Sequence, residues 1–307
     1  MPITYADKRE PAHFAGRPPK IHEFKPADIT EAADHILRSD RSNRRSFVLE
    51  VLKEFVILTE HTLYALVHER VSISDNIRTF QRLLRNYKDT GLISDAPFGV
   101  LKAVVRAGLP KPSGGSLRAF CLGPAGEEYL RRKSEEAKPP TLTATEGHLA
   151  HDLICAEAML KLRAMWKEHP TSPGLVEVRG PREVSLWDPE KKVFVVAPDG
   201  LLIKRKLNGD FERGFLVEYQ NVRALLQVQN KIKKYEEIAR PENRWMWNFW
   251  GMEEMPWVLI VHRQGATLQH YQEEITRRGE MAARFAAIAL EDIWAGNLFI
   301  KPMRANR

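Results

Sequence analysis

Two acidic residues lie in apolar segments whose spacing predicts a paired arrangement. Asp199 follows Pro198 at the start of PDGLLI, and Glu218 follows the apolar run FLV in FLVEYQN. The dipeptide Asn208-Gly209 lies between the two segments, and Asn-Gly is a strong signal for a β-hairpin turn. Both acids are at similar distances along the chain from this turn. We therefore expect them to stand nearly opposite each other on paired strands, within reach of one ion.

The chemistry that such a pair supports is metal binding. Two carboxylates with a backbone carbonyl form a hard oxygen site that suits Mg²⁺ or Mn²⁺. A metal of this kind polarises a phosphoryl oxygen and lowers the pKa of an attacking water. Gln220 lies two residues after Glu218 and shares its face of the strand.

Two other interpretations of these residues stay open. A Pro-Asp dipeptide before glycine is usually just a turn. Burying Glu218 among apolar residues costs several kcal/mol unless something pairs with it, and a structural cation such as Lys231 could be that partner.

The elements that carry these residues predict an α/β arrangement with a mixed sheet covered by helices. Helical patterns cover residues 147–168, 224–240 and 266–279. Strand patterns occur in 175–180, 182–187, 193–206, 213–221, 255–263 and 284–293.

A different organisation is expected before residue 134. Residues 46–133 show three helical patterns followed by a short hairpin and a closing helix. Thr59 is expected to cap the second helix, Ser74 or Asp75 to cap the third, and Gly91 to end the third. A glycine-rich and proline-rich excursion is expected at 97–115. The third helix has an apolar face formed by Ile77, Phe80, Leu84 and Tyr87, and a basic face formed by Arg78, Arg82, Arg85 and Lys88.

This order resembles a winged helix-turn-helix domain, on the phrases RLLRNYKDTGLI and FCLGPAGEEYL. The resemblance implies that the third helix enters the DNA major groove, where arginines reach phosphates or guanine edges. A merely solvated basic face and a winged helix used for protein contact are the alternatives.

The later region resembles the PD-(D/E)xK nuclease superfamily, with Pro198-Asp199 as the first motif and Glu218-Tyr219-Gln220 as the second. The resemblance implies that the two acids hold the metal while a lysine orients or activates the water. Gln220 stands at the lysine position and could only position the water by hydrogen bonding. The resemblance also implies a lysine from the following helix, Lys231 or Lys233, and a third metal-binding acid from the first helix, Glu157 or alternatively Asp152.

A closer resemblance is to the replication-relaxation family of plasmid and mobile-element proteins. It rests on Gly147-His148-Leu149, Pro198-Asp199-Gly200, Glu218-Tyr219-Gln220 and the helix segment from Lys231 to Tyr235. The family name implies a role in replication or transfer of plasmid DNA. Gln220 departs from the family pattern, which often has aspartate there. Outside these motifs, His148, His151 and Asp152 are expected to have a helix-capping or surface role.

Composition sets the broad class. The chain has 307 residues, a formal net charge of +7 and 43% hydrophobic residues, which suits two folded domains and a polyanionic partner. No apolar run is long enough to span a membrane, the first residues lack a signal-peptide core, and two cysteines cannot form a zinc framework. A cytoplasmic location is therefore expected. The expected domains are a mobile arm (1–45), a winged helix (46–133), a linker (134–146) and a nuclease-like domain (147–307).

These patterns together predict a DNA-binding protein with a metal-dependent endonuclease-like domain that hydrolyses phosphodiester bonds in plasmid or mobile-element DNA. Its cofactor would be Mg²⁺ or Mn²⁺ and its partner double-stranded DNA. The oligomeric state is left open, with a dimer as one option. The alternative is an inactive nuclease fold that docks DNA or protein in a replication, transposition or defence complex.

Overall fold

The computed structural model describes residues 25–39, 46–71, 76–110, 116–133, 145–169, 174–188, 193–220, 225–263, 268–279 and 283–303. Together they form a mixed α+β structure. The elements before residue 134 are α1 (Pro26–Ser39), α2 (Ser46–Phe55), β1 (Ile57–Thr59), α3 (Glu60–Val71), α4 (Ile77–Asp89), β2 (Ile93–Asp95), α5 (Phe98–Arg106), β3 (Ala119–Leu122) and α6 (Pro124–Lys133).

The three short strands of this part form an antiparallel sheet in the order β1-β3-β2. Helix α4 begins where the side chain of Asn76 accepts a hydrogen bond from the backbone N–H of Arg78. The predicted caps Ser74 and Asp75 lie outside the described residues. Gly91 follows the helix with a φ of 74°, a conformation that glycine adopts without steric cost. The three helices α2, α3 and α4, the short strands β2 and β3 and the closing helix α6 occur in the expected order, whereas strand β1 was not expected.

Two segments of this part differ from the prediction. Residues 26–39, expected within a mobile arm, form helix α1, because Ala33 and Ile36 provide an apolar stripe that is buried. An ion pair of 2.5 Å joins Arg132 of α6 to Asp34 of α1. The excursion at 97–115 contains helix α5, which begins directly after Pro97 and packs against a helix of the second part. Residues 1–24 and 40–45 of the expected arm lie outside the described residues.

The second part contains α7 (Glu146–Lys167), β4 (Leu175–Arg179), α8 (Pro181–Val184), β5 (Leu186–Asp188), β6 (Val193–Val196), β7 (Gly200–Arg205), β8 (Phe211–Gln220), α9 (Leu225–Ile238), the 3₁₀ turn Pro241–Asn243, α10 (Arg244–Phe249), β9 (Trp257–His262), α11 (Leu268–Arg278), β10 (Phe285–Ala289), α12 (Leu290–Ala295) and β11 (Lys301–Met303). The expected linker residues 134–144 lie outside the described residues.

A six-stranded sheet with the order β11-β10-β9-β8-β7-β4 organises this part. Strands β4, β7 and β8 pair antiparallel, whereas β8, β9 and β10 run parallel, so the sheet is mixed as predicted. The turn between β7 and β8 has Gly209 at a φ of 91° after Asn208, as the Asn-Gly signal predicted. The prediction did not include α8, α10, α12 or β11, and the expected strand at 284–293 ends at Ala289, where α12 begins.

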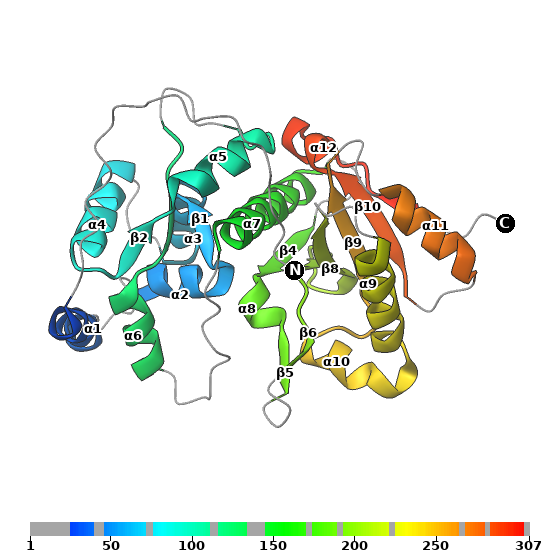
Figure 1. The fold of residues 1–307 in the computed structure, drawn as a ribbon, viewed down its shortest axis with the longest axis horizontal. Coiled ribbons are helices and arrows are strands. Elements are labelled where there is room, and N and C mark those ends of the chain that lie inside the picture. The colour runs from blue at the N-terminus through cyan, green and yellow to red at the C-terminus, as the bar shows by residue number, and fades with distance from the viewer. Residues whose placement is uncertain are drawn as a thin grey trace.

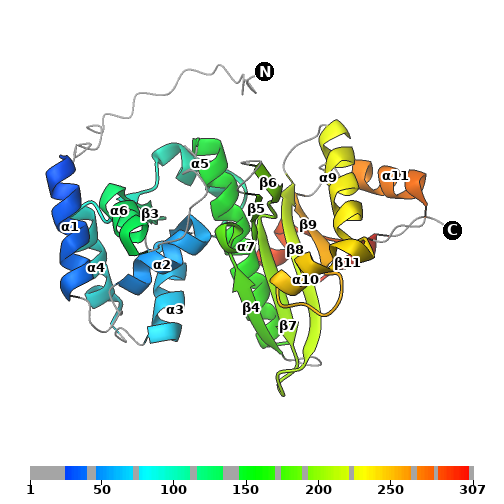
Figure 2. The same ribbon diagram turned by 90° about the horizontal axis from the view of Figure 1, so that it is seen from below.

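Helices cover both faces of the sheet, as Figures 1 and 2 show. Helix α7 lies on one face, between the sheet and the N-terminal part, whereas α9, α10 and α11 lie on the other. One continuous hydrophobic core runs from the N-terminal helices through α7 to the first face, where Val217 and Tyr219 of β8 join it. A second core lies under α9 and includes Leu216 of β8 and Ile232. The N-terminal part and the sheet therefore pack as one body around α7.

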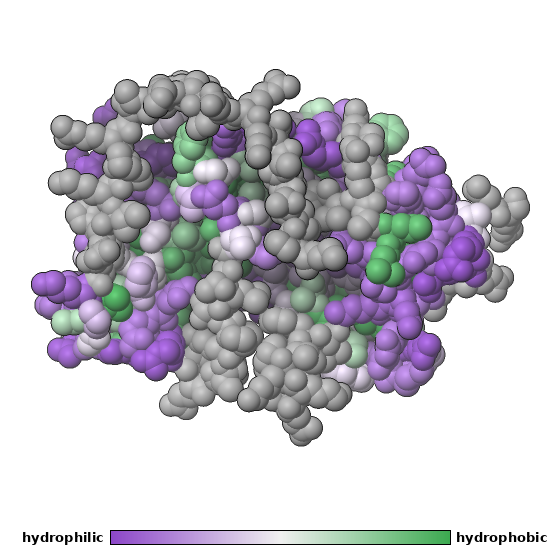
Figure 3. Space-filling model, in the orientation of Figure 1, coloured by the Kyte–Doolittle hydropathy of each residue, from purple (hydrophilic) through white to green (hydrophobic). Residues whose placement is uncertain are grey.

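The outer surface follows the usual amphipathic division. Hydrophilic residues cover the exposed side of α11 in the space-filling view (Figure 3), where Arg277 and Arg278 form ion pairs with Glu274. In the described part of the chain, no helix combines the length and the apolar character needed to cross a membrane.

Candidate active site

The hairpin β7–β8 brings the two predicted acids to one end of the sheet. Gly200, the first residue of β7, pairs with Val217 of β8, so the next position outward sets Asp199 beside Glu218. The backbone N–H of Asp199 donates to the carbonyl of Val217 at 3.0 Å, which continues this register by one hydrogen bond. The predicted register of the two acids is the register of the structure.

Glu218 belongs to the face of β8 that is covered by α9. Only 3% of the residue is exposed. Its carboxylate accepts hydrogen bonds from the Lys231 ammonium and the Tyr235 hydroxyl, two residues one turn apart on α9. Burial raises the pKa of Glu218, Lys231 opposes that rise, and the nearby Asp199 carboxylate adds to it. The lysine considered as a structural partner from the sequence is thus in contact with this acid.

Asp199 lies in the bend just before β7 and takes a different set of partners. Its Oδ2 accepts a hydrogen bond of 2.8 Å from the backbone N–H of Tyr219. The same oxygen is 3.4 Å from Nε2 of His151 on α7. The Cys155 thiol, one turn after His151, contacts the backbone carbonyl of Asp199 at 3.7 Å. Helix α7 and strand β8 therefore hold Asp199 between them.

The prediction of a surface or capping role was wrong for His151 and Asp152, because the N-terminal half of α7 packs directly over the end of β8. His151 Nε2 lies 3.1 Å from the carbonyl oxygen of Tyr219, and Nδ1 lies 3.4 Å from Asp152 Oδ1. Burial lowers the pKa of His151, but Asp199 and Asp152 outweigh it and raise the pKa to about 9. The imidazole is therefore cationic at neutral pH. His148 is exposed in the first turn of α7 and so has the predicted surface role, whereas the helix cap is Thr145, whose hydroxyl oxygen accepts a hydrogen bond from the His148 backbone N–H at 3.3 Å.

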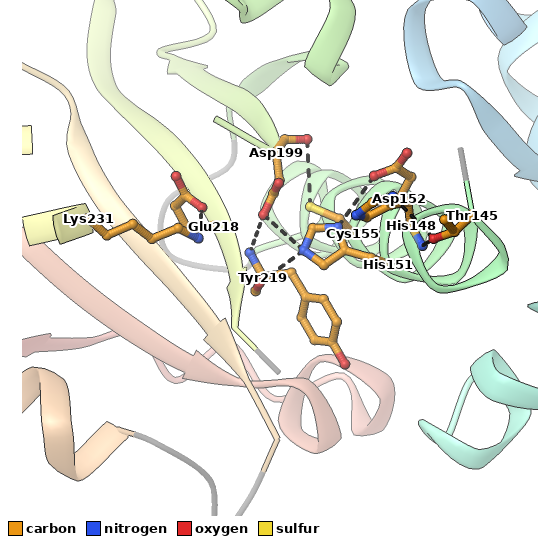
Figure 4. Close-up of polar contacts among 9 residues, drawn as sticks. All are labelled: Thr145, His148, His151, Asp152, Cys155, Asp199, Glu218, Tyr219 and Lys231. Carbon is orange, nitrogen blue, oxygen red and sulfur yellow. Dashed lines mark hydrogen bonds and ion pairs between the residues drawn. The ribbon is translucent and has the colours of Figure 1, made fainter. Parts of the chain in front are cut away.

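The two carboxylates do not converge, which corrects the expectation that they face one ion directly. Figure 4 shows Glu218 with Lys231 on one side of β8 and Asp199 with His151 on the other. Regular side-chain alternation sends Glu218 toward α9. Strand pairing ends at Gly200, so Asp199 is free of that alternation and turns to the Tyr219 N–H at the ladder edge. The charge of Asp199 still acts on the pKa of Glu218, so both belong to one electrostatic cluster.

Of the other residues predicted for this site, Lys231 contacts an acid, whereas Gln220 contacts a tyrosine and Lys233 is exposed. Gln220 is buried, and its side-chain oxygen accepts a hydrogen bond of 3.1 Å from the Tyr271 hydroxyl of α11. Lys233 is exposed on α9, while Lys231 on another face of the helix reaches Glu218. Of the two lysines predicted from the resemblance, the structure brings Lys231 to the acids.

Glu157, predicted as the third metal-binding acid, lies elsewhere. It points from α7 toward the N-terminal part, where its carboxylate accepts hydrogen bonds from the backbone N–H of Thr59 at 3.0 Å and the Thr62 hydroxyl at 2.7 Å. Helical geometry explains the error, since Glu157 and Asp152 are five residues apart and project from different faces of α7. Asp152, the alternative acid, is the one on the side of Asp199.

The donor chemistry of the cluster suits a hard divalent cation in part. Within the described ranges, no group of three or more His, Cys, Asp and Glu side chains is arranged to hold a metal ion. Mg²⁺, however, is usually bound by one or two carboxylates, and water and substrate phosphates complete its shell. Asp199 and Glu218 are the two carboxylates of the cluster, but they lie on opposite sides of β8, so one of them would have to turn before both could bind the same ion. Lys231 already gives Glu218 a cationic partner, so a metal ion would have to share or displace it.

The basic face of α4 is open to solvent. Arg78, Arg82 and Arg85 are exposed. Lys88 instead forms an ion pair with Asp95 of β2. On the opposite face Phe80, Leu84 and Tyr87 are buried as predicted, but Ile77 is 39% exposed because it begins the helix beyond the edge of the core.

Sequence reasoning undervalued His151, named Tyr235 only as part of a family motif without a role in the site, and did not include Tyr271. A signal was present for two of them. Tyr235 follows Lys231 by four residues, a spacing that sets both on one helix face. His151 precedes Cys155 by the same interval on α7, and both contact Asp199. Tyr271 reaches the site only through the packing of α11 on α9.

Among solved structures, the chain is similar to the restriction endonuclease FokI, with a TM-score of 0.29, 13% identity and coverage of 83% of this chain and 44% of that chain. The structure of FokI bound to DNA gives a TM-score of 0.26 and 14% identity, with coverage of 83% of this chain and 45% of that chain. This chain thus spans less than half the length of those chains. No curated protein matches the sequence. The replication-relaxation family model matches residues 49–248, about two thirds of the chain, and the protein belongs to that family.

Proposed function

We propose that this protein binds double-stranded DNA through residues 46–133, acting as a winged helix unit, and hydrolyses phosphodiester bonds at the Asp199–Glu218 cluster with Mg²⁺ or Mn²⁺. Residues 147–307 would form the nuclease-like unit of the PD-(D/E)xK type. The observation that carries the proposal is Glu218, a carboxylate 3% exposed at the end of an apolar strand, beside Asp199 and in contact with Lys231. Buried acids with raised pKa values beside a specific charge partner are typical of catalytic sites.

Each side chain would have a defined role in this reaction. Asp199 would hold the ion, and Glu218 could join it only by turning from Lys231 toward the side of β8 on which Asp199 lies. When bound, the divalent ion supplies a Lewis acid that polarises a phosphoryl oxygen and lowers the pKa of an attacking water. Lys231 is half-buried, so its ammonium can remain with Glu218 while facing a phosphate. Tyr235 restrains Glu218 from the same helix. Gln220 is bonded to Tyr271, which favours a packing role over the water-positioning role proposed from its motif position.

The DNA-binding role rests on α4. Its buried stripe fixes the helix on the core, and its exposed arginines form one outward face. An α-helix fits the major groove, and arginine makes bidentate contacts with phosphates and guanine. Arg78, Arg82 and Arg85 are therefore the proposed DNA contacts, with Lys88 secondary because of its pairing with Asp95.

Membership of the replication-relaxation family supports a setting in plasmid or mobile-element DNA replication or transfer. A cytoplasmic location follows from that setting, and the free thiols of Cys121 and Cys155 are compatible with it. Other replication, transposition or defence proteins are the partners that such a setting would supply.

Nicking of supercoiled plasmid DNA with increasing Mg²⁺ or Mn²⁺ tests the proposal. Asp199→Asn combined with Glu218→Gln is expected to abolish nicking and leave DNA affinity unchanged. Lys231→Met should also reduce nicking strongly, while Lys233→Met, on the exposed face of the same helix, should not. Undiminished nicking by the double variant would reject the site.

A second function has a specific observation in its favour. The Glu218–Lys231 pair and the separation of the carboxylates by β8 also suit a nuclease fold that has lost catalysis and serves as a DNA or protein docking module. That function predicts DNA binding with no metal-dependent nicking by the wild-type protein, and no effect of Asp199→Asn on any DNA transaction.

A further inference from the structure

Asp199 needs contacts beyond the strand ladder to keep its position. It lies outside β7, in a bend, and its one ladder-type hydrogen bond is from its own N–H to Val217. Its side chain is therefore not oriented by strand pairing. A ligand or catalytic carboxylate functions only when its geometry is restrained by neighbouring groups.

Helix α7 supplies these contacts from two residues on one face. His151 reaches Asp199 Oδ2 at 3.4 Å and also lies 3.1 Å from the carbonyl of Tyr219, the residue whose N–H donates to that same oxygen. The imidazole therefore spans the side chain of Asp199 and the backbone of β8. Cys155 contacts the Asp199 carbonyl from one turn further along the helix.

The imidazole is itself held in place. Asp152 Oδ1 lies 3.4 Å from its Nδ1, and the ring packs against the Tyr219 ring with centroids 5.2 Å apart. Asp152, His151 and Asp199 form a continuous carboxylate–histidine–carboxylate chain (Figure 4). An arrangement in which a carboxylate orients a histidine is a recurrent way of fixing the geometry of a site.

We infer that His151, backed by Asp152, is the positioning residue of Asp199: it holds Oδ2 against the Tyr219 amide and so fixes the carboxylate for the cation of the proposed function. The inference rests on that function for its consequence, although the positioning itself is a property of the protein without metal. In this role His151 acts through Asp199.

The test compares His151→Ala with His151→Gln. Both variants lose the imidazole charge, but glutamine retains an N–H donor near the position of Nε2, so their difference reports position and not charge. His148→Ala is the matched control, because His148 lies in the first turn of α7 and bonds to Thr145. Thermal unfolding of every variant establishes that each is folded.

The first readout is amide hydrogen exchange at Tyr219 in the metal-free full chain. His151→Ala should exchange at least several times faster at Tyr219 than His151→Gln, because the Asp199 oxygen that accepts this N–H is no longer restrained. His148→Ala should match the wild type. Equal protection of Tyr219 in the alanine and glutamine variants overturns the inference.

The second readout is Mn²⁺ affinity in the absence of DNA, measured by electron paramagnetic resonance. His151→Ala should bind Mn²⁺ about 10- to 100-fold more weakly than His151→Gln, the range found when residues that orient metal ligands are removed. When the wild type binds Mn²⁺, equal Mn²⁺ affinity of the two folded variants also overturns the inference. If even the wild type binds no Mn²⁺ while the exchange difference is present, positioning is supported and the proposed metal-dependent function is rejected.

Discussion

The carboxylate of Glu157 on α7 accepts a 2.7 Å hydrogen bond from the hydroxyl of Thr62 on α3, and so joins the two parts of the chain. Thr59 donates its backbone N–H to the same carboxylate at 3.0 Å. Burial raises the pKa of Glu157, and these hydrogen bonds partly oppose the rise. An acid expected to bind metal is instead part of the packing between the helical part and the sheet.

We expect Glu157→Ala to destabilise the whole chain by about 1–3 kcal/mol, because it leaves a buried N–H and a hydroxyl without their acceptor. Urea unfolding measures the change. Glu157→Gln keeps an acceptor oxygen, so it should lower the free energy of unfolding by less than Glu157→Ala does. It should leave Mn²⁺ affinity unchanged. A large loss of Mn²⁺ affinity in a folded Glu157→Gln variant would return this residue to the metal site.

Glu54 gives the contact between α2 and α8 a pH dependence. Burial and the charge of Glu183 raise its pKa from 4.5 to about 7, although Arg70 and the Gly180 N–H oppose the rise. The folded protein therefore holds this proton more tightly than the unfolded chain. The resulting stabilisation is complete below pH 4.5 and is lost as the pH rises to about 7.

Glu54→Gln removes this titration. We expect the free energy of unfolding of the variant to increase relative to that of the wild type by roughly 1–3 kcal/mol between about pH 5 and pH 8, so that the variant becomes relatively more stable as the pH rises. Urea unfolding at both pH values measures it, and subtraction of the wild type cancels the other titrating groups. A difference that does not change with pH contradicts the assignment.

Lys231→Met removes the cationic partner of a buried acid. We expect the free energy of unfolding to fall by about 1–3 kcal/mol at neutral pH. This is less than for a fully buried pair, because the Lys231 ammonium keeps some solvent contact. Without the lysine, burial and Asp199 raise the pKa of Glu218 further, so the folded state takes up a proton and the loss should be smaller at low pH.

The matched experiment combines Lys231→Met with Glu218→Gln. Since the double variant buries no unpaired charge, it should recover most of the lost stability in urea unfolding. A double variant as unstable as Lys231→Met would show that the ion pair is not the source of the effect.

The arginine face of α4 should dominate DNA affinity. Replacing Arg78, Arg82 and Arg85 together with alanine should weaken binding and lower the slope of log affinity against log salt by about 0.9 for each DNA phosphate that is no longer neutralised. Fluorescence anisotropy with duplex DNA at several salt concentrations measures both. Lys88→Ala should have a smaller effect because of the Asp95 pair.

Arg277→Ala, on the exposed side of α11 at the other end of the molecule, serves as the control for nonspecific charge. If it weakens DNA binding as much as a single α4 substitution, the α4 face is not the DNA-binding surface.

The sequence alone determined the elements whose signals are local. The Asn208-Gly209 turn and the apolar runs on both sides of it specified the β7–β8 hairpin and hence the register that brings Asp199 beside Glu218. The heptad-like spacing of Phe80, Leu84 and Tyr87 specified the buried face of α4. Such features depend on residues close in the chain, which interact whatever the rest of the fold does.

The tertiary structure decided where the side chains at the ends of these elements point. Whether Asp199 turns toward Glu218 or toward α7 depends on His151, nearly fifty residues earlier in the chain, and on the end of strand pairing at Gly200. Whether Glu157 joins the acids or the N-terminal part depends on which face of α7 lies on the sheet. These outcomes come from long-range packing and the desolvation of buried charges, which no local spacing encodes.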